Sequence, residues 1–168
     1  MTNIQTIREQ VLIAVVNWTK PYYVRWFKPN RAAWTHNRNS LLKFPPQTLG
    51  RDLGDFLARE NLELMPNLED HDVLHVLLHY QTTIVDEVRM QYFLLGNHKR
   101  SAYAIFTALI ALLIVPEHWS TFFREFKIGR SCMPISKWDF AHLLNEPTPF
   151  LRNQIYRNVN AEEAPFLL

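Results

Sequence analysis

The chain contains a single cysteine, Cys132, among its 168 residues. An internal disulfide is therefore excluded, and a small disulfide-stapled fold with it. An excess of one charge is also missing, since 18 basic and 16 acidic side chains leave a formal net charge of +2. This balance argues against a nucleic-acid partner, whose binding requires a strongly basic surface.

Long hydrophobic runs are absent too. The most apolar stretch, Ala102 to Val115, is shorter than the roughly 20 residues that a transmembrane helix needs. The amino-terminal residues lack the basic start, apolar block and small-residue cleavage site of a secretory signal. We therefore expect a cytoplasmic protein with no signal peptide and no transmembrane helix.

Apolar residues are nevertheless plentiful, at 48% of the chain, and they include eleven phenylalanines and five tryptophans. This composition is typical of a packed globular protein, and the length suits one domain over residues 1–168. Apolar residues recur at three- and four-residue intervals, the spacing of one helix face. The sequence predicts an all-α, single-domain helical bundle. Its helices are expected at about residues 4–18, 48–61, 68–79, 83–95, 101–115, 116–129, 136–144 and 148–156.

Two histidines in the third of these helices have the spacing of a metal site. His71 and His75 are four residues apart, so both imidazoles leave one helix face about 6 Å apart along the axis and can reach one ion. Asp72 lies at the edge of the same face. Its carboxylate can be a third ligand or a partner that orients His71, and the spacing allows both roles.

Glu87 completes the set only if the helix breaks. It follows His75 by twelve residues, which on a straight helix would be about 18 Å, far beyond the reach of a shared metal. Residues 80–83 are poor helix formers, and Thr83 can cap a second helix that returns antiparallel. Two imidazoles and one or two carboxylates favour zinc, with iron or manganese as alternatives. The alternative without a metal leaves His75 in the core and Glu87 at the surface.

The sequence around these residues resembles a known family. The run HDVLHVLLHYQTTIVDEV, from His71 to Val88, is similar to the signature HDxxH, eleven residues, E of the coenzyme Q biosynthesis protein 4 family. The segments LLKFPPQTLGRDLGDFLARENL, before it, and IGRSCMPISKWDF, after it, extend the resemblance over roughly Leu41 to Asn145. His79 and Asp86 stand where that family commonly has glycine.

The resemblance implies an all-helical protein of ubiquinone biosynthesis. It implies that His71, Asp72, His75 and Glu87 are both the metal ligands and the catalytic residues. The substrate would be a polyprenylated hydroxybenzoate or quinone precursor held in an apolar groove or channel. The reaction would be metal-dependent decarboxylation at ring carbon one, either simple or oxidative, which makes the protein a lyase. Expected partners are the inner face of the membrane, as a peripheral surface, other quinone-biosynthesis proteins and a second copy of the chain in a homodimer.

Further residues are compatible with that implication. The apolar stretch Ala102 to Val115 and the aromatic residues that follow it can line a groove for an isoprenoid tail, although core packing explains them as well. Arg51 and Arg130 are candidates to bind a carboxylate or phosphate headgroup, because guanidinium groups suit such oxyanions. Each of these arginines can equally form a surface ion pair.

The sequence is compatible with two other functions. The first is a lipid-binding scaffold for other quinone-biosynthesis enzymes, in which the metal is structural and no reaction takes place. The second is a phosphohydrolase that uses adjacent His and Asp residues. It needs a further upstream histidine and a downstream aspartate, for which His36 and Asp139 are the candidates.

Overall fold

The computed structural model describes residues 6–15, 18, 33–99 and 101–159. These residues form helices and loops without a strand; one isolated bridge joins Thr48 to Pro147. Residues 6–15 are helical, while both ends of the predicted helix 4–18 include residues outside the described part. The all-α prediction is confirmed. The remaining helices are α2 (Arg38–Leu41), α3 (Leu49–Arg59), α4 (Glu69–Leu78), α5 (Ile84–Gly96), α6 (Ala102–Ile114), α7 (Trp119–Ser131) and α8 (Thr148–Tyr156), with short 3-10 helices η1 (Pro116–His118) and η2 (Phe140–Leu143).

Side-chain caps explain where three helices begin. The hydroxyl groups of Thr48, Thr83 and Ser101 each accept a hydrogen bond from the backbone N–H three residues on. Such a bond satisfies one of the amides that a helix start leaves unpaired. The helix predicted from residue 136 is the exception, because only the 3-10 helix η2 forms there, after Asp139. Phe140 begins η2 and Leu144 directly follows it, and both side chains are buried.

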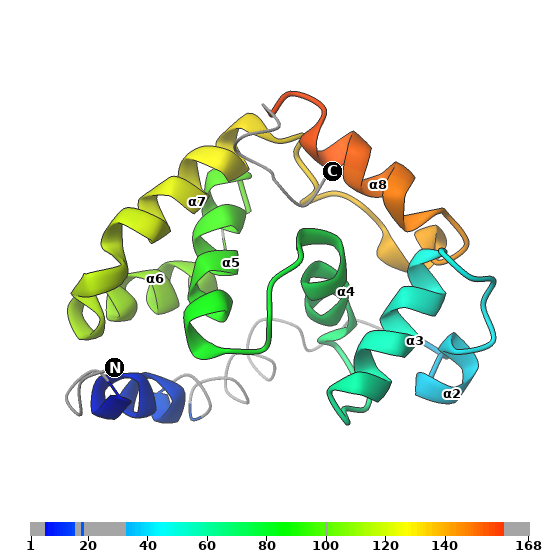
Figure 1. Cartoon of the computed structure of the whole chain (residues 1–168), viewed down its shortest axis with the longest axis horizontal. Coiled ribbons are helices and arrows are strands. Elements are labelled where there is room, and N and C mark those ends of the chain that lie inside the picture. Colours follow the sequence, from blue (N-terminus) through cyan, green and yellow to red (C-terminus); the bar gives the residue numbers. More distant parts are fainter. Residues whose placement is uncertain (1–5, 16–17, 19–32, 100, 160–168) are drawn as a thin grey trace.

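The helices pack around two hydrophobic clusters that meet at α5. In Figure 1, α6 and α7 lie on one side of α5, and α4 lies between α5 and the helices α3 and α8. Met90 and Phe93 of α5 belong to the larger cluster, which it shares with α3, α4 and α8. Val88 and Tyr92, on the other side of the helix, belong to the smaller cluster with α6 and α7. Helix α5 is therefore buried on two sides.

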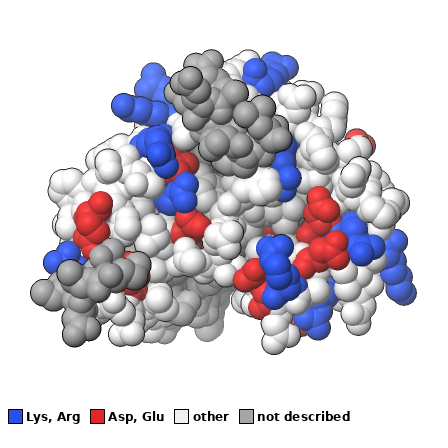
Figure 2. Space-filling model, in the orientation of Figure 1, with Lys and Arg blue, Asp and Glu red and all other residues white. Residues whose placement is uncertain are grey.

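The surface combines mixed charge with exposed apolar side chains. Acidic and basic side chains interleave over α2 and α3 on the face drawn in Figure 2. No helix among the described residues is long and apolar enough to cross a bilayer by itself. The pair formed by α6 and residues 116–131 passes the same test of length and hydropathy together, but the two halves meet at an angle of 109°.

Candidate metal centre

The chain reverses direction between the two helices that carry the predicted ligands. Helix α4 ends at Leu78, and His79 has a left-handed backbone with φ 58°. Glycine is common at this position after a helix, because it adopts positive φ without a steric penalty. Thr83 then caps α5 by accepting a hydrogen bond from the Asp86 amide. The break predicted near residues 80–83 is therefore confirmed, and Glu87 lies in the first turn of the returning helix.

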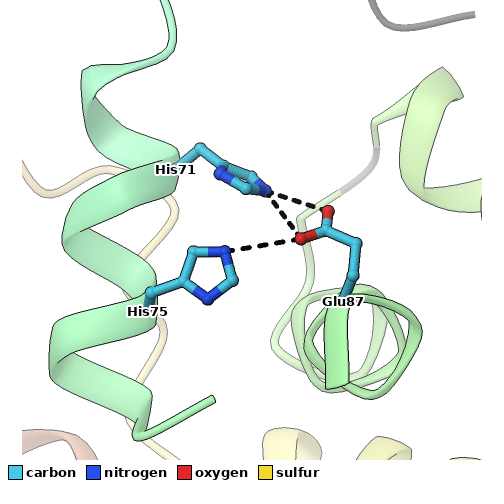
Figure 3. Close-up of side chains that lie close together, drawn as sticks. All are labelled: His71, His75 and Glu87. Carbon is cyan, nitrogen blue, oxygen red and sulfur yellow. Dashed lines mark hydrogen bonds and ion pairs between the residues drawn. The ribbon is translucent and has the colours of Figure 1, made fainter. Parts of the chain in front are cut away.

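The reversal brings His71, His75 and Glu87 together. The Nε2 atom of His71 lies 2.9 Å and 3.0 Å from the two carboxylate oxygens of Glu87. The Nε2 atom of His75 lies 3.4 Å from Oε2 of the same carboxylate. Figure 3 shows both rings of α4 directed at the Glu87 side chain of α5. His75 and Glu87 are buried, at 6% and 8% relative exposure, so the three groups meet inside the protein.

Each ligand atom is oriented by a neighbour. The Nδ1 atom of His75 donates to the backbone carbonyl of Tyr80 at 3.1 Å, which turns Nε2 of the ring toward Glu87. Nδ1 of His71 lies 3.6 Å from Oδ1 of Asp72. Gln91 donates from Nε2 to Oε1 of Glu87 at 3.0 Å. Carbonyl or carboxylate partners behind ligand imidazoles are a regular feature of protein metal sites.

This donor set fits a tetrahedral metal ion. With bonds of about 2.0–2.2 Å, the ligand atoms of such a site lie roughly 3.3–3.6 Å apart. One ligand atom from each of His71, His75 and Glu87 lies within 4.8 Å of the others, so small side-chain shifts would suffice. Two imidazoles and one carboxylate are also one of the ligand sets of catalytic zinc, in which the fourth position stays open. The three residues are thus the ones that could hold the ion.

The electrostatic state of Glu87 suits the same role. Burial raises the pKa of this carboxyl group, but the adjacent His71 and His75 outweigh it, and the pKa lies well below its ordinary value. Glu87 is therefore a carboxylate at neutral pH. A charged carboxylate needs no deprotonation before it binds a cation.

The remaining predicted residues lie apart from this triad. Asp72 stands beside the far nitrogen of His71, which is the placement of an orienting partner. Arg51 donates from Nε to Asp55 on its own helix, at 2.9 Å to Oδ2, and Arg130 is exposed near the end of α7. The two residues predicted for a phosphohydrolase, His36 and Asp139, also contact other residues. His36 packs edge-on against Phe44, and Asp139 forms an exposed ion pair with His142.

An ion pair between Arg89 of α5 and the buried Glu125 of α7, which the sequence analysis missed, stabilises the turn beside the site. The Tyr80 hydroxyl donates to Oε2 of Glu125 at 2.8 Å. Nη2 of Arg89 donates to the other oxygen of Glu125 at 2.6 Å, and Nη1 donates to Asp86, also at 2.6 Å. Glu125 lies 45 residues after Tyr80, so no local pattern indicates the contact. The contact of Gln91 with Glu87 could have been predicted from the sequence, because the two residues are four positions apart on one helix face.

Comparison with known proteins establishes the fold. No family model matches the chain, and no curated protein matches it. A crystal structure from Nostoc punctiforme PCC 73102, of a protein named a "putative ubiquinone biosynthesis protein", superposes with a TM-score of 0.55 at 18% sequence identity. The match covers 94% of this chain and 83% of the other. The chain therefore shares its helical fold with that protein.

Proposed function

We propose that this protein is a metal-dependent decarboxylase that removes the C1 carboxylate from a polyprenylated hydroxybenzoate in ubiquinone biosynthesis. The observation that carries the proposal is the meeting of His71, His75 and Glu87 at the reversal between α4 and α5, with His75 and Glu87 each held by a hydrogen bond to a neighbour. The fold shared with a protein named for ubiquinone biosynthesis supports the pathway. The sequence motif from His71 to Glu87 supports it independently.

The roles of the residues follow from their positions. His71, His75 and Glu87 hold the ion, with zinc favoured by the donor set and iron or manganese as alternatives. Tyr80 and Gln91 keep two of these ligands in place. A bound divalent ion supplies positive charge that stabilises the negative charge developing on the ring oxygen as the carboxylate is lost. Asp72 orients His71.

Turnover by the metal-loaded protein tests this reaction. Purified full-length protein is loaded with zinc, iron or manganese and given a hydroxybenzoate with a short prenyl chain, and the product is followed by mass spectrometry. We expect the substrate to lose carbon dioxide, with a proton taken up at ring carbon one, or its carboxyl group to be replaced by hydroxyl if the metal is redox-active and oxygen is present. Protein that retains its metal and binds the substrate but leaves it unchanged would rule out the decarboxylase.

Replacement of Glu87 separates catalysis from structure. Glu87→Gln keeps the size of the side chain and removes the charge, so we expect turnover to fall at least about a hundredfold. The fold, measured by circular dichroism, and the binding of the prenylated ligand should persist. The matched control is Glu63→Gln, because Glu63 is an exposed acid on the surface, where it pairs with Arg38. Equal activity of the two variants would contradict a role for Glu87.

A non-catalytic scaffold is the second candidate function, and the burial of the triad favours it. The side chains of His75 and Glu87 are only 4% and 10% exposed, which also suits a structural ion that no substrate reaches. In that case the protein presents a prenylated lipid to other quinone-biosynthesis enzymes. Loss of folding in Glu87→Gln, or on removal of the metal, would select the scaffold.

We also propose that the protein binds a membrane surface peripherally, through α6 and α7. Exposed apolar side chains on α6 include Ile105, Leu109 and Leu113, which repeat every four residues and so share one face. Trp119 and Phe123 are exposed on the adjoining segment. Apolar faces of this kind mark interaction surfaces, and the same face gives an isoprenoid tail a route from the bilayer. A homodimer through this face is the competing arrangement.

A further inference from the structure

A small pocket lies on the other side of His75. It is bounded by α3, by the turn between α4 and α5 and by α8, and its volume is about 230 Å³. Pockets for drug-sized ligands occupy roughly 300–1,000 Å³, so this one suits a single substituted ring and not a prenyl chain. Its lining includes Phe56, His75, Tyr80 and Arg152. His75 therefore contributes both to this pocket and to the metal triad.

Arg152 brings a positive charge to the pocket, where Asp52 is an acidic neighbour. Its Nη2 atom donates to the backbone carbonyl of Val76 at 2.8 Å, while its Nε atom is buried without a hydrogen-bond partner. Arg152 forms no ion pair with any residue that the structure describes. Burial lowers the pKa of Arg152, although the charge of Asp52 opposes the shift. A half-buried guanidinium that keeps an unpaired donor can bind an anionic ligand that enters the pocket.

Three acidic residues also line the pocket, Asp52, Asp55 and Glu60, and none of them forms an ion pair with Arg152. Asp55 is already paired with Arg51. Glu60 accepts hydrogen bonds from Arg59 at 3.1 Å and from the Thr82 hydroxyl at 3.0 Å. These two carboxylates are therefore neutralised by neighbours on the rim. The unused donors of Arg152 are left for a group that enters from outside.

The other walls suit an aromatic ring. Phe56 stacks on the imidazole of His75, with ring centroids 5.6 Å apart and planes inclined by 14°. Tyr80, also buried, lines the same pocket. Flat side chains favour a flat ligand, and a planar guanidinium matches a carboxylate with two parallel hydrogen bonds.

We propose that this pocket binds the carboxylate of a single-ring aromatic acid through Arg152, with the ring against Phe56 and His75. The inference rests on the proposed function, since it places the hydroxybenzoate headgroup beside the metal ligand His75. It assigns headgroup recognition to Arg152, in place of the predicted Arg51 and Arg130. The prenyl chain must then leave the pocket, because the volume holds only the ring.

Calorimetric titration of the metal-loaded full chain tests the assignment. The probes are 4-hydroxybenzoate and phenol, which share the ring and hydroxyl and differ in the carboxylate. We expect the acid to bind at least tenfold more tightly than phenol, and Arg152→Gln to weaken the acid by about tenfold to a hundredfold while phenol is unchanged. Arg157→Gln, at the exposed end of the same helix, is the matched control and should bind the acid like the wild type.

A second variant covers the case in which Arg152→Gln does not fold. Arg152→Lys keeps the charge but loses the planar pair of donors, so the acid should still bind several times more weakly than to the wild type. Equal affinity for acid and phenol, or wild-type affinity in the folded Arg152 variants, would overturn the proposal. Displacement of the acid by inorganic phosphate at an equal concentration would also overturn it, because the site would then select a small anion and not an aromatic acid.

The experiments distinguish a failure of the proposed pocket from a failure of the proposed decarboxylase. Binding of 4-hydroxybenzoate that depends on Arg152, without turnover of the prenylated substrate, supports the pocket and removes the decarboxylase. Normal turnover by the wild type, with an unchanged affinity for the acid in Arg152→Gln, removes the pocket and retains the decarboxylase.

Discussion

Among single residues, Tyr80 connects the metal triad to the buried ion pair between α5 and α7. Its carbonyl accepts the hydrogen bond that orients His75, and its hydroxyl donates to Glu125. The Arg89 guanidinium lies 5.4 Å from the centre of its ring. Burial raises the pKa of the Tyr80 hydroxyl well above its ordinary value, and the Glu125 charge adds to the shift. Tyr80 is thus a neutral donor in the folded protein.

Tyr80→Phe should reveal this contribution through its pH dependence. At about pH 7 we expect the free energy of unfolding to fall by about 1.5–3 kcal/mol, because the hydrogen bond to a charged acceptor is lost. Above pH ~10 the unfolded wild-type chain ionises at Tyr80 while the folded chain does not, so the stabilisation is lost as the pH rises. The difference between variant and wild type should therefore narrow between about pH 9 and pH 11 in urea unfolding. A difference that is constant across this range would contradict the buried donor.

At the scale of elements, α5 and α7 cross with their backbones in contact. A Cβ atom added to Gly129 of α7 would collide with the carbonyl oxygen of Phe93 in α5. One added to Gly96 of α5 would collide in the same way with Phe126 of α7. Nearby, the buried Asn97 side chain donates to the Gly129 and Met133 carbonyls. This crossing positions α5, and with it Glu87, relative to the rest of the molecule.

Gly129→Ala tests the crossing by the sign of its effect. In an ordinary helix interior, this replacement stabilises by about 0.5–1 kcal/mol. Here we expect a loss of about 1–3 kcal/mol or more in chemical unfolding, because backbone atoms must move apart. Metal affinity should fall with it, since α5 carries Glu87. A gain in stability would show that the helices are not in contact at this point.

For the whole molecule, the exposed apolar face of α6 is the surface through which we propose that the protein binds a membrane. Leu109 and Leu113 are 58% and 80% exposed, and each would be buried by a lipid surface. We expect the wild type to sediment with phospholipid vesicles and the double variant Leu109→Ser, Leu113→Ser to bind at least about tenfold more weakly. Leu62→Ser, which replaces an exposed leucine in the loop after α3, is the matched control.

The competing occupant of this face is a second copy of the chain. Analytical ultracentrifugation of the same variants distinguishes the two. A dimer of the wild type that the double variant abolishes, with no binding of either protein to vesicles, would assign the face to dimerisation and exclude the membrane.

Local chemistry in the sequence determined the helices and part of the site. Thr48, Thr83 and Ser101 cap helices where a hydroxyl precedes an apolar repeat, because a cap depends only on residues three positions apart. His71 and His75 share a face for the same reason. Even the reversal before α5 was predicted from residues 80–83, although the left-handed turn occurs at His79. These features involve only short separations along the chain.

Tertiary packing decided everything that joins distant segments. The 2.9 Å approach of His71 to Glu87 depends on how α5 packs between two cores. Arg152 reaches the pocket beside His75 from α8, 76 residues away from its partner Val76. Arg51, which the sequence suggested, is held instead by Asp55. Spacing on one helix is set by its regular backbone, whereas contacts between helices depend on the volume and burial of every side chain between them.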